Sequence, residues 1–238
     1  MRILVPVLAY LCLLGAPEAL LARQVICTRP GGACPPQPDT VVVGLAMDGA
    51  TGAPLSDVVV HFEGSGVEVI TTSNGVIRAP GPDRLRPVVL HHRCYYSVRL
   101  DFTPPFGPLN VGLPRRPSVG CGQDWPAVSE PPDPGARWQL HGTVYEATKD
   151  SPVAGPSWFM TAGIGSAGAA LDDAGRFAFS LPNTSPSVDI RVSGACHAPL
   201  TVLAVAPVAD GVRLDVRIPW TPDPPATDMS ACGSGPEG

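Results

Sequence analysis

The sequence predicts an all-β protein made of two tandem, Ig-like β-sandwich domains, and three observations point to this fold class. First, the segment that begins at Gly44 recurs at Gly142, Cys94 matches Cys196 and Leu113 matches Ile218, so the offset grows only from 98 to 105 residues. A domain has therefore been built twice. Second, short runs of β-branched and aromatic residues alternate with Gly, Pro, Asn and Asp. Third, 30 Pro and 26 Gly in 238 residues disfavour long helices.

The N-terminus has the pattern of an export signal over residues 1–22. Arg2 supplies the positive start, residues 3–15 are apolar, and small residues follow up to Ala22, where we expect cleavage (Ala19 is the alternative). The apolar run is too short to span a membrane, and no later run is long enough. We therefore expect a secreted or periplasmic protein, which begins with a Pro/Gly-rich leader at 23–38.

Both repeats show the strand pattern of a sandwich. We expect domain 1 over 39–122, a stiff Pro-rich linker over 123–137, domain 2 over 138–232, and a disordered tail over 233–238. Expected strands in domain 1 lie at 41–43, 58–60, 67–70, 76–77, 88–90, 96–102 and 109–113. Those in domain 2 lie at 139–145, 157–161, 177–181, 188–192, 200–205 and 212–218. The last run alternates throughout, which predicts a solvated face carrying Arg213, Asp215 and Arg217. The glycine-rich segment 163–168 is expected to be a flexible turn.

Six cysteines remain after removal of the signal, and the repeat restricts how they pair. Each repeat has one Cys in a central strand and a second just past its last strand, while two more lie together in the leader. This arrangement predicts disulfides between Cys27 and Cys34, Cys94 and Cys121, and Cys196 and Cys232. A zinc site is the alternative, but the sequence has no CxxC pair and no Cys/His cluster with zinc spacing.

The repeated motif resembles the carboxypeptidase regulatory-like domain. In domain 1 it reads Gly44-x-x-x-Asp48-x-x-Thr51-Gly52-x-Pro54, followed by Asn74-Gly75-x-Ile77. Domain 2 repeats it around Gly142, Pro152 and Gly175. The resemblance implies a seven-stranded, transthyretin-like sandwich in each domain. It implies little about activity, because the matching positions are turn and core residues.

Candidate catalytic residues are few. His91, His92, Tyr95 and Tyr96 lie in a stretch similar to that of intradiol ring-cleavage dioxygenases, which bind iron through two His and two Tyr. Adjacent residues on a strand point to opposite faces, so these pairs are poorly placed to share one metal. We therefore expect no enzyme activity and no cofactor.

The remaining hypothesis is a non-catalytic binding or structural protein of the bacterial envelope. Lys149 is the only lysine, a bias typical of GC-rich bacterial genomes, and no basic patch indicates nucleic-acid binding. The expected partner is a protein or a polysaccharide outside the cytoplasm, bound through loops or sheet edges. Trp138 and Trp220 are candidates for stacking on sugar rings, which would make the protein a carbohydrate-binding module.

Overall fold

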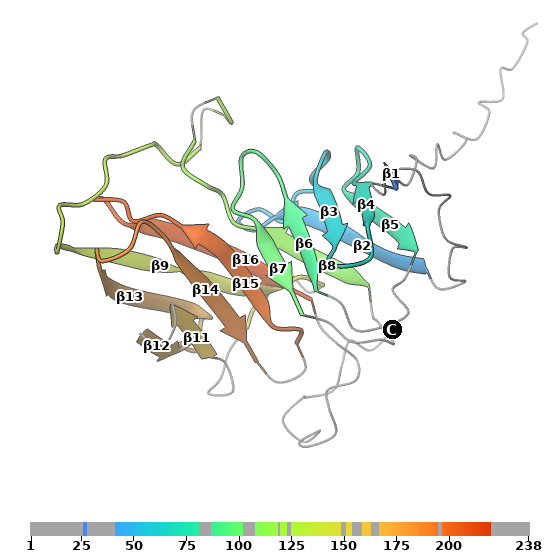
Figure 1. The fold of residues 1–238 in the computed structure, drawn as a ribbon. Helices are drawn as coiled ribbons and strands as arrows, with labels where there is room; N and C mark the ends of the chain where they lie inside the picture. Colours follow the sequence, from blue (N-terminus) through green and yellow to red (C-terminus); the bar gives the residue numbers. More distant parts are fainter. Residues whose placement is uncertain are drawn as a thin grey trace, which may run out of the picture.

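The computed structural model describes residues 26–27, 41–80, 87–101, 108–118, 120–122, 125–148, 151–153, 159–162, 167–194 and 197–219. Within these residues the protein is all-β and contains no helix (Figure 1). Consequently, the described part of the chain has no helix that is long and apolar enough to cross a membrane. The predicted signal peptide and tail lie outside the described residues.

Each repeat contributes seven strands, which confirms the predicted fold class. Repeat 1 holds β2 (Val41–Asp48), β3 (Val59–Phe62), β4 (Val67–Ile70), β5 (Val76–Pro80), β6 (Val88–His91), β7 (Val98–Leu100) and β8 (Leu109–Leu113). Repeat 2 holds β9 (Arg137–Glu146), β11 (Phe159–Ala162), β12 (Ala167–Ala170), β13 (Arg176–Pro182), β14 (Val188–Ser193), β15 (Leu200–Val205) and β16 (Val212–Ile218). Two short strands, β1 (Ile26–Cys27) and β10 (Ser151–Pro152), pair with β4 and β9.

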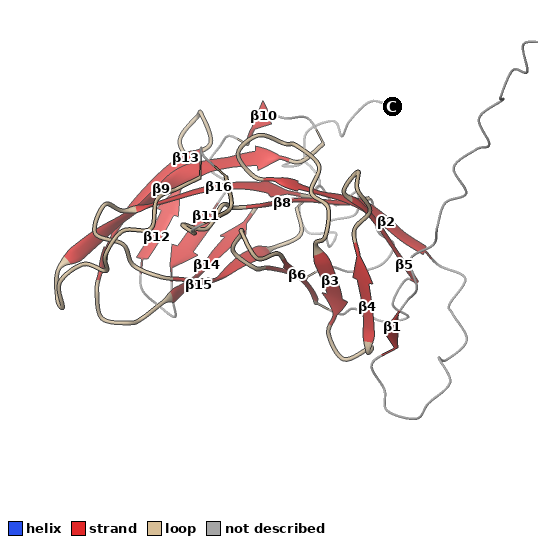
Figure 2. Ribbon diagram, turned by 90° about the horizontal axis from the view of Figure 1, so that it is seen from above, coloured by secondary structure: helices blue, strands red, loops and turns tan. Residues whose placement is uncertain are grey.

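The repeats do not stand apart, because their strands form two sheets that both run through the whole molecule. Sheet A has the order β1-β4-β3-β6-β7-β15-β14-β11-β12. Sheet B has the order β10-β9-β16-β8-β2-β5, with β13 also paired to β9. Figure 2 shows the two sheets as stacked layers, with repeat 1 at one end and repeat 2 at the other. The sequence did not predict this continuity.

The repeats meet through equivalent strands, so the join has approximate twofold symmetry. In sheet A, β7 pairs antiparallel with its counterpart β15, and Arg99 lies opposite Thr201. In sheet B, β8 pairs antiparallel with its counterpart β16, and Gly112 lies opposite Arg217. Each of these two pairs joins residues at the same position of the repeat, which places the pseudo-twofold axis between them.

The apolar core fills the space between the sheets along the whole length. The largest fully buried side chains come from both repeats and both sheets, and they include Phe62, Leu100, Trp138, Leu140 and Leu214. Sheet A continues across the join through fully buried apolar residues on β7 and β15. Burial of apolar surface stabilises a fold by about 25 cal/mol per Å². The contact between the two repeats is therefore stabilised in the same way as the hydrophobic core of a single domain.

The outer face of β16 differs from the expectation. Alternation predicts three solvated side chains, yet only Arg213 is exposed, while Asp215 and Arg217 are 7% and 3% exposed. The loop after β2 covers them: Arg217 Nε donates a 3.0 Å hydrogen bond to the carbonyl of Gly49. The guanidinium of Arg217 also lies 4.8 Å from the ring centroid of Tyr145. A strand pattern shows which face a residue occupies but not which loop folds over that face.

The glycines of the repeated motif have a structural role. Gly75 and Gly175 both adopt positive φ, 73° and 69°. A Cβ at Gly75 would lie 2.6 Å from the carbonyl oxygen of Ala46, and one at Gly175 would lie 2.8 Å from that of Val144. Only glycine tolerates such a conformation this close to a neighbouring backbone, so the motif is maintained by turn geometry.

Candidate functional site

The carboxylate of Asp48 organises the end of repeat 1 that faces repeat 2. Asp48 is the last residue of β2, and its Oδ1 accepts hydrogen bonds from the backbone N–H groups of Ala50 and Thr51, both at 2.9 Å. Its Oδ2 accepts one bond from the Tyr95 hydroxyl and one from Arg115 Nε, both at 2.8 Å. The side chain of Asp48 thereby links the turn after β2, the turn after β6 and the segment after β8.

The protonation states of this cluster follow from burial and hydrogen bonding. Burial alone would raise the pKa of Asp48, but the bonds from Arg115, from the Thr51 backbone and from Tyr95 outweigh it and lower that pKa. Burial and then the bond to Asp48 raise the pKa of Tyr95. Burial likewise raises the pKa of Tyr96 to about 12. At neutral pH, Asp48 is therefore ionised and both tyrosines are protonated.

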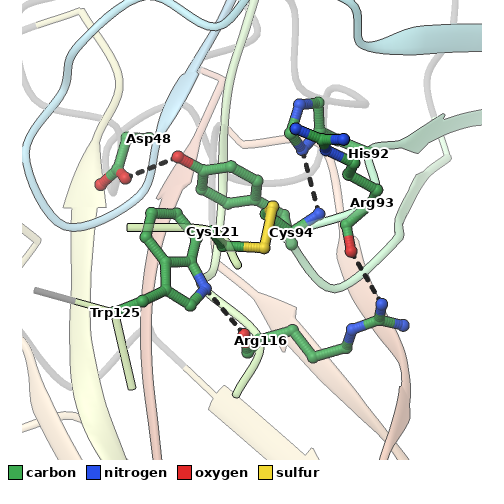
Figure 3. Close-up of a disulfide and its surroundings, with 8 residues drawn as sticks. Asp48, His92, Arg93, Cys94, Arg116, Cys121 and Trp125 are labelled. Atoms are coloured by element: carbon green, nitrogen blue, oxygen red, sulfur yellow. Dashed lines mark hydrogen bonds between the residues drawn. A yellow bond between two sulfur atoms is a disulfide. The ribbon is translucent and has the colours of Figure 1, made fainter. Parts of the chain in front are cut away.

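A disulfide and a tryptophan lie beside the tyrosine ring that is bonded to Asp48 (Figure 3). Cys94 and Cys121 are joined, as predicted, so the chain leaving repeat 1 is held against the turn after β6. Trp125 follows closely and meets the Tyr95 ring edge to face at 5.0 Å, while the Arg115 guanidinium lies 4.7 Å from the Trp125 ring centroid. Sequence reasoning placed Trp125 in a plain linker; the signal it missed is a tryptophan four residues after a bridged cysteine.

A groove runs along the outer face of sheet B where the repeats meet. We call it the join groove, and it consists of two adjoining hollows that share Pro126 and Arg213. The first, of about 310 Å³, is lined by Ala50, Arg115, Trp125, Pro126, Arg213 and Asp215. The second, of about 220 Å³, extends over the linker and over β9 and β16, with Ser129, His141 and Asp210 among its lining residues. Both repeats and the linker therefore contribute to one surface.

Arg213 is the exposed cation of the join groove. Its Nε lies 2.8 Å from Asp215 Oδ2, and Asp215 Oδ1 accepts the backbone N–H of Thr143 at 3.1 Å. The Asp215 carboxylate is buried whereas the Arg213 side chain is 66% exposed. Asp215 thus orients the guanidinium and leaves much of it facing solvent. Arg213 and His141 also line a third, larger hollow of about 510 Å³ beside β13.

The histidines and tyrosines considered for iron binding have separate partners. His91 Nδ1 lies 2.7 Å from Ser97 Oγ. His92 Nδ1 accepts the backbone N–H of Cys94 at 3.2 Å, and burial followed by the charge of Arg93 lowers the pKa of His92. The Tyr95 hydroxyl is bonded to Asp48. Among the described residues, no group of three or more His, Cys, Asp or Glu side chains could hold a metal ion.

The two tryptophans proposed for sugar stacking are not placed alike. Trp138 is 2% exposed and lies in the core between the sheets, because it falls on the inward-facing positions of β9. It offers no face to a ligand, and the prediction for this residue is wrong. Trp220 lies outside the described residues. The predicted disulfides Cys27–Cys34 and Cys196–Cys232 also involve side chains outside the described residues and remain predictions.

Comparison with known proteins gives little further guidance. Neither a family model nor a curated protein matches the chain. Among solved structures, the chain is similar to the Bacillus anthracis TIE protein, with 12% sequence identity and a TM-score of 0.29. That alignment covers 76% of this chain and 34% of the other, so this chain spans about a third of the length of that protein.

Proposed function

We propose that this is an exported, non-catalytic binding protein in which two carboxypeptidase regulatory-like repeats form one continuous platform for a macromolecular partner outside the cytoplasm. The observation that carries the proposal is the join groove, a surface to which both repeats and the linker contribute. Its exposed guanidinium, Arg213, is held in place by a buried carboxylate. Arg213 lines the same hollow as the ring of Trp125, and a fixed cation and an aromatic ring in one hollow are suited to recognising a partner.

The state of the ionisable groups favours binding over catalysis. General acid–base chemistry at neutral pH needs a group whose pKa lies near the working pH. In the cluster that supports the groove, the pKa of Asp48 is shifted down and that of Tyr95 is shifted up, so both move away from neutrality. Asp215 is bonded to Arg213 and to a backbone N–H. The hydrogen bonds of Asp48, Tyr95 and Asp215 thus favour a structural role for these side chains, which hold the surface in place.

The proposal is tested by capture from the native extracellular material on immobilised protein. Arg213→Glu should abolish retention of the partner, because it replaces the exposed positive charge with a negative charge next to the carboxylate of Asp215. Arg191→Glu is the matched control, since Arg191 is an exposed arginine on sheet A. If nothing is retained above background, or if Arg213→Glu retains the partner as wild type does, the groove is not the binding surface.

Export is tested separately. N-terminal sequencing of the protein recovered from its native host should find a mature chain that starts after Ala22 or Ala19. Recovery from the cytoplasm with Met1 or Arg2 at the N-terminus would contradict the proposed location.

A carbohydrate partner is the second candidate, and one observation favours it. Trp125 lines the join groove beside Arg115 and Asp215, which places an aromatic ring next to hydrogen-bonding groups. Isothermal titration against a panel of polysaccharides should then give heat that Arg213→Ala reduces. The same panel with Trp220→Ala checks the tryptophan predicted from the sequence. No heat with any glycan would exclude this candidate.

A further inference from the structure

The outer face of sheet B in repeat 1 exposes apolar side chains next to a free edge. Val43 on β2 is 51% exposed and Val76 on β5 is 36% exposed. Val43 lies opposite Arg78, and Leu45 lies opposite Val76. Directly opposed residues of an antiparallel pair project from the same face. These four residues therefore form one surface, which we call the β5 patch.

Repeat 2 shows that the fold does not require this patch to be apolar. The equivalent strands, β9 and β13, pair in the same register, with Thr143 opposite Arg176 and His141 opposite Ala178. The positions of the three apolar residues of the patch are thus occupied by His141, Thr143 and Arg176. The same backbone carries polar side chains in one repeat and, in the other, two exposed valines beside the half-buried Leu45. An exposed apolar cluster of this kind marks an interaction site.

The outer edge of β5 has no paired strand within the described part of the chain. Among the described residues, β5 pairs with β2 on one side, and no strand lies on its other side. Ala46 N–H donates to the carbonyl of Gly75, so alternate residues of β5, starting from Gly75, direct their backbone groups toward β2. Val76 and Arg78 then point theirs outward. Both outward groups of Val76 bond to Thr72. For the outward groups of Arg78, no bond to a described residue is found.

Charge decides which partner fits this edge. Two copies of the chain paired antiparallel about the centre of β5 would place Arg78 opposite Arg78, and like charges directly opposed are destabilising. Arg78 is exposed and makes no ion pair with another described residue. A strand that places a carboxylate beside Arg78 and an apolar side chain beside Val76 removes the repulsion and covers the apolar surface.

We propose that the open edge of β5 binds an extended peptide segment of another protein by strand addition, with an apolar and an acidic side chain two residues apart facing the β5 patch. This inference rests on the proposed binding function and specifies a protein partner at a second location, away from the join groove. Main-chain bonds to Arg78 supply affinity, and the patch supplies specificity.

A charge exchange tests the proposal. The probes are two synthetic nine-residue peptides titrated into the full-length mature protein. The first is Val-Thr-Val-Thr-Glu-Thr-Val-Thr-Val, which places Val two residues from Glu on the same face, and the second has Lys in place of the central Glu. Wild type should bind the Glu peptide roughly fivefold more tightly than the Lys peptide, the upper range for a cross-strand charge pair. Arg78→Glu should reverse the order. Equal affinities in wild type, or no reversal in the variant, would overturn the site.

Two further variants test the edge and the patch. Arg78→Pro removes the outward N–H at a position where an edge strand tolerates proline, so it should abolish binding of both peptides. Val43→His installs the residue that repeat 2 has at this position and should weaken both. Ala178→Glu is the control for Arg78→Glu, because Ala178 occupies the equivalent position on β13. It should leave both affinities unaltered. Binding that survives Arg78→Pro in a folded protein contradicts strand addition.

Two other readouts separate this inference from its alternatives. Amide exchange of the 76–80 segment should slow when the Glu peptide is bound. A mass that rises with protein concentration and falls in Arg78→Pro would instead make the edge a contact between copies, against the proposal. The capture experiment distinguishes this inference from the proposed function. Suppose that Arg213→Glu no longer retains the native partner, that Arg78→Pro still retains it, and that wild type binds neither peptide. The proposed function then stands and the β5 site fails.

Discussion

Asp48 shows how much of the candidate site depends on one ion. Four hydrogen bonds from three separate segments converge on its two oxygens, and its side chain is only 3% exposed. A buried carboxylate is costly unless every oxygen is satisfied. Here two backbone N–H groups, a tyrosine and an arginine satisfy it, and the same bonds fix the ring on which Trp125 rests. The ionised carboxylate of Asp48 therefore determines where Tyr95 and Trp125 lie, and with them the shape of the groove.

Asp48→Asn should destabilise the protein by about 2–3 kcal/mol, because it removes the negative charge that accepts the bond from Arg115 Nε. The figure lies below that for a fully buried pair, since Arg115 is 25% exposed. Urea unfolding at pH 7 measures it. Asp172→Asn is the control, because Asp172 makes similar local bonds on the exposed surface, and its effect should be much smaller. Equal effects would mean that the Asp48 cluster contributes no special stability.

The same residue predicts an acid dependence. The folded-state pKa of Asp48 lies below the ordinary value of 3.8, so the unfolded chain takes up a proton first as the pH falls. The stabilisation by this group is present above about pH 4 and is lost as the pH drops through the folded pKa. The stability difference between wild type and Asp48→Asn should shrink below pH 4. A difference that is constant between pH 7 and pH 3 would show that the pKa is not lowered.

At the scale of single strands, the sequence predicts most of the structure and fails where side chains are small. Every expected strand is present in the described residues, because alternation of valine and leucine with polar residues determines which face is buried. Among the strands that were not expected, β12 has an Ala-Gly-Ala-Ala sequence of low strand propensity, and its first two residues were predicted to belong to a flexible turn. This strand forms because every residue of β11 pairs with a residue of β12. Tertiary pairing overrides local preference there.

The Cys94–Cys121 disulfide should contribute to the stability of this arrangement by restricting the unfolded chain. The cysteines are 27 residues apart, and chain-entropy theory gives about 3.5 kcal/mol for such a loop. The double variant Cys94→Ala/Cys121→Ala should lose stability of this order in urea unfolding. A loss below about 1 kcal/mol would indicate that the packing of Tyr95 and Trp125 already holds the chain in place.

Where β8 pairs with β16, a residue without a side chain lies opposite one with a long side chain, an arrangement that a symmetric dimer could not have. Gly112 and Arg217 occupy the same repeat position and face each other, so two identical repeats would bring two arginines or two glycines together. A Cβ at Gly112 would lie 2.6 Å from Cβ of Arg217. The missing side chain on one strand therefore makes room for the arginine stem on the other, and the repeats are no longer interchangeable.

Gly112→Ala should accordingly destabilise the protein by about 1–3 kcal/mol through overpacking. The cost should fall by at least about 0.5 kcal/mol in the Arg217→Gly background, because that change removes the Cβ, Cγ and Cδ atoms that lie nearest to Gly112. In the Arg213→Ala background it should stay unchanged, because Arg213 is not among the nearest neighbours of Gly112. Equal costs in all three backgrounds would mean that the two strands do not pack as described.

At the scale of the whole molecule, the sequence predicts two sandwiches but not that they share their sheets. The repeat and the strand runs define each unit, whereas the pairing of β7 with β15 depends on edge strands whose partners no local pattern specifies. Arg217 illustrates this limit: its position indicates a solvated face, but the loop after β2 of the neighbouring repeat folds over it. The Pro-rich segment was likewise predicted as a spacer, yet it lies along repeat 2, where Glu130 accepts a bond from Ala209 N–H.

Because both sheets cross the join, the two repeats should unfold as one cooperative unit. Native-state hydrogen exchange should give the same opening free energy for β3 and β6 of repeat 1 as for β11 and β14 of repeat 2. Gly112→Arg, which sets arginine against arginine on the pseudo-twofold axis, should lower both values together, since neither repeat keeps its central edge covered without the other. If one repeat exchanges at a distinctly lower free energy in wild type, or if Gly112→Arg affects only one of them, the join is a contact between independent domains and the groove upon it need not persist in solution.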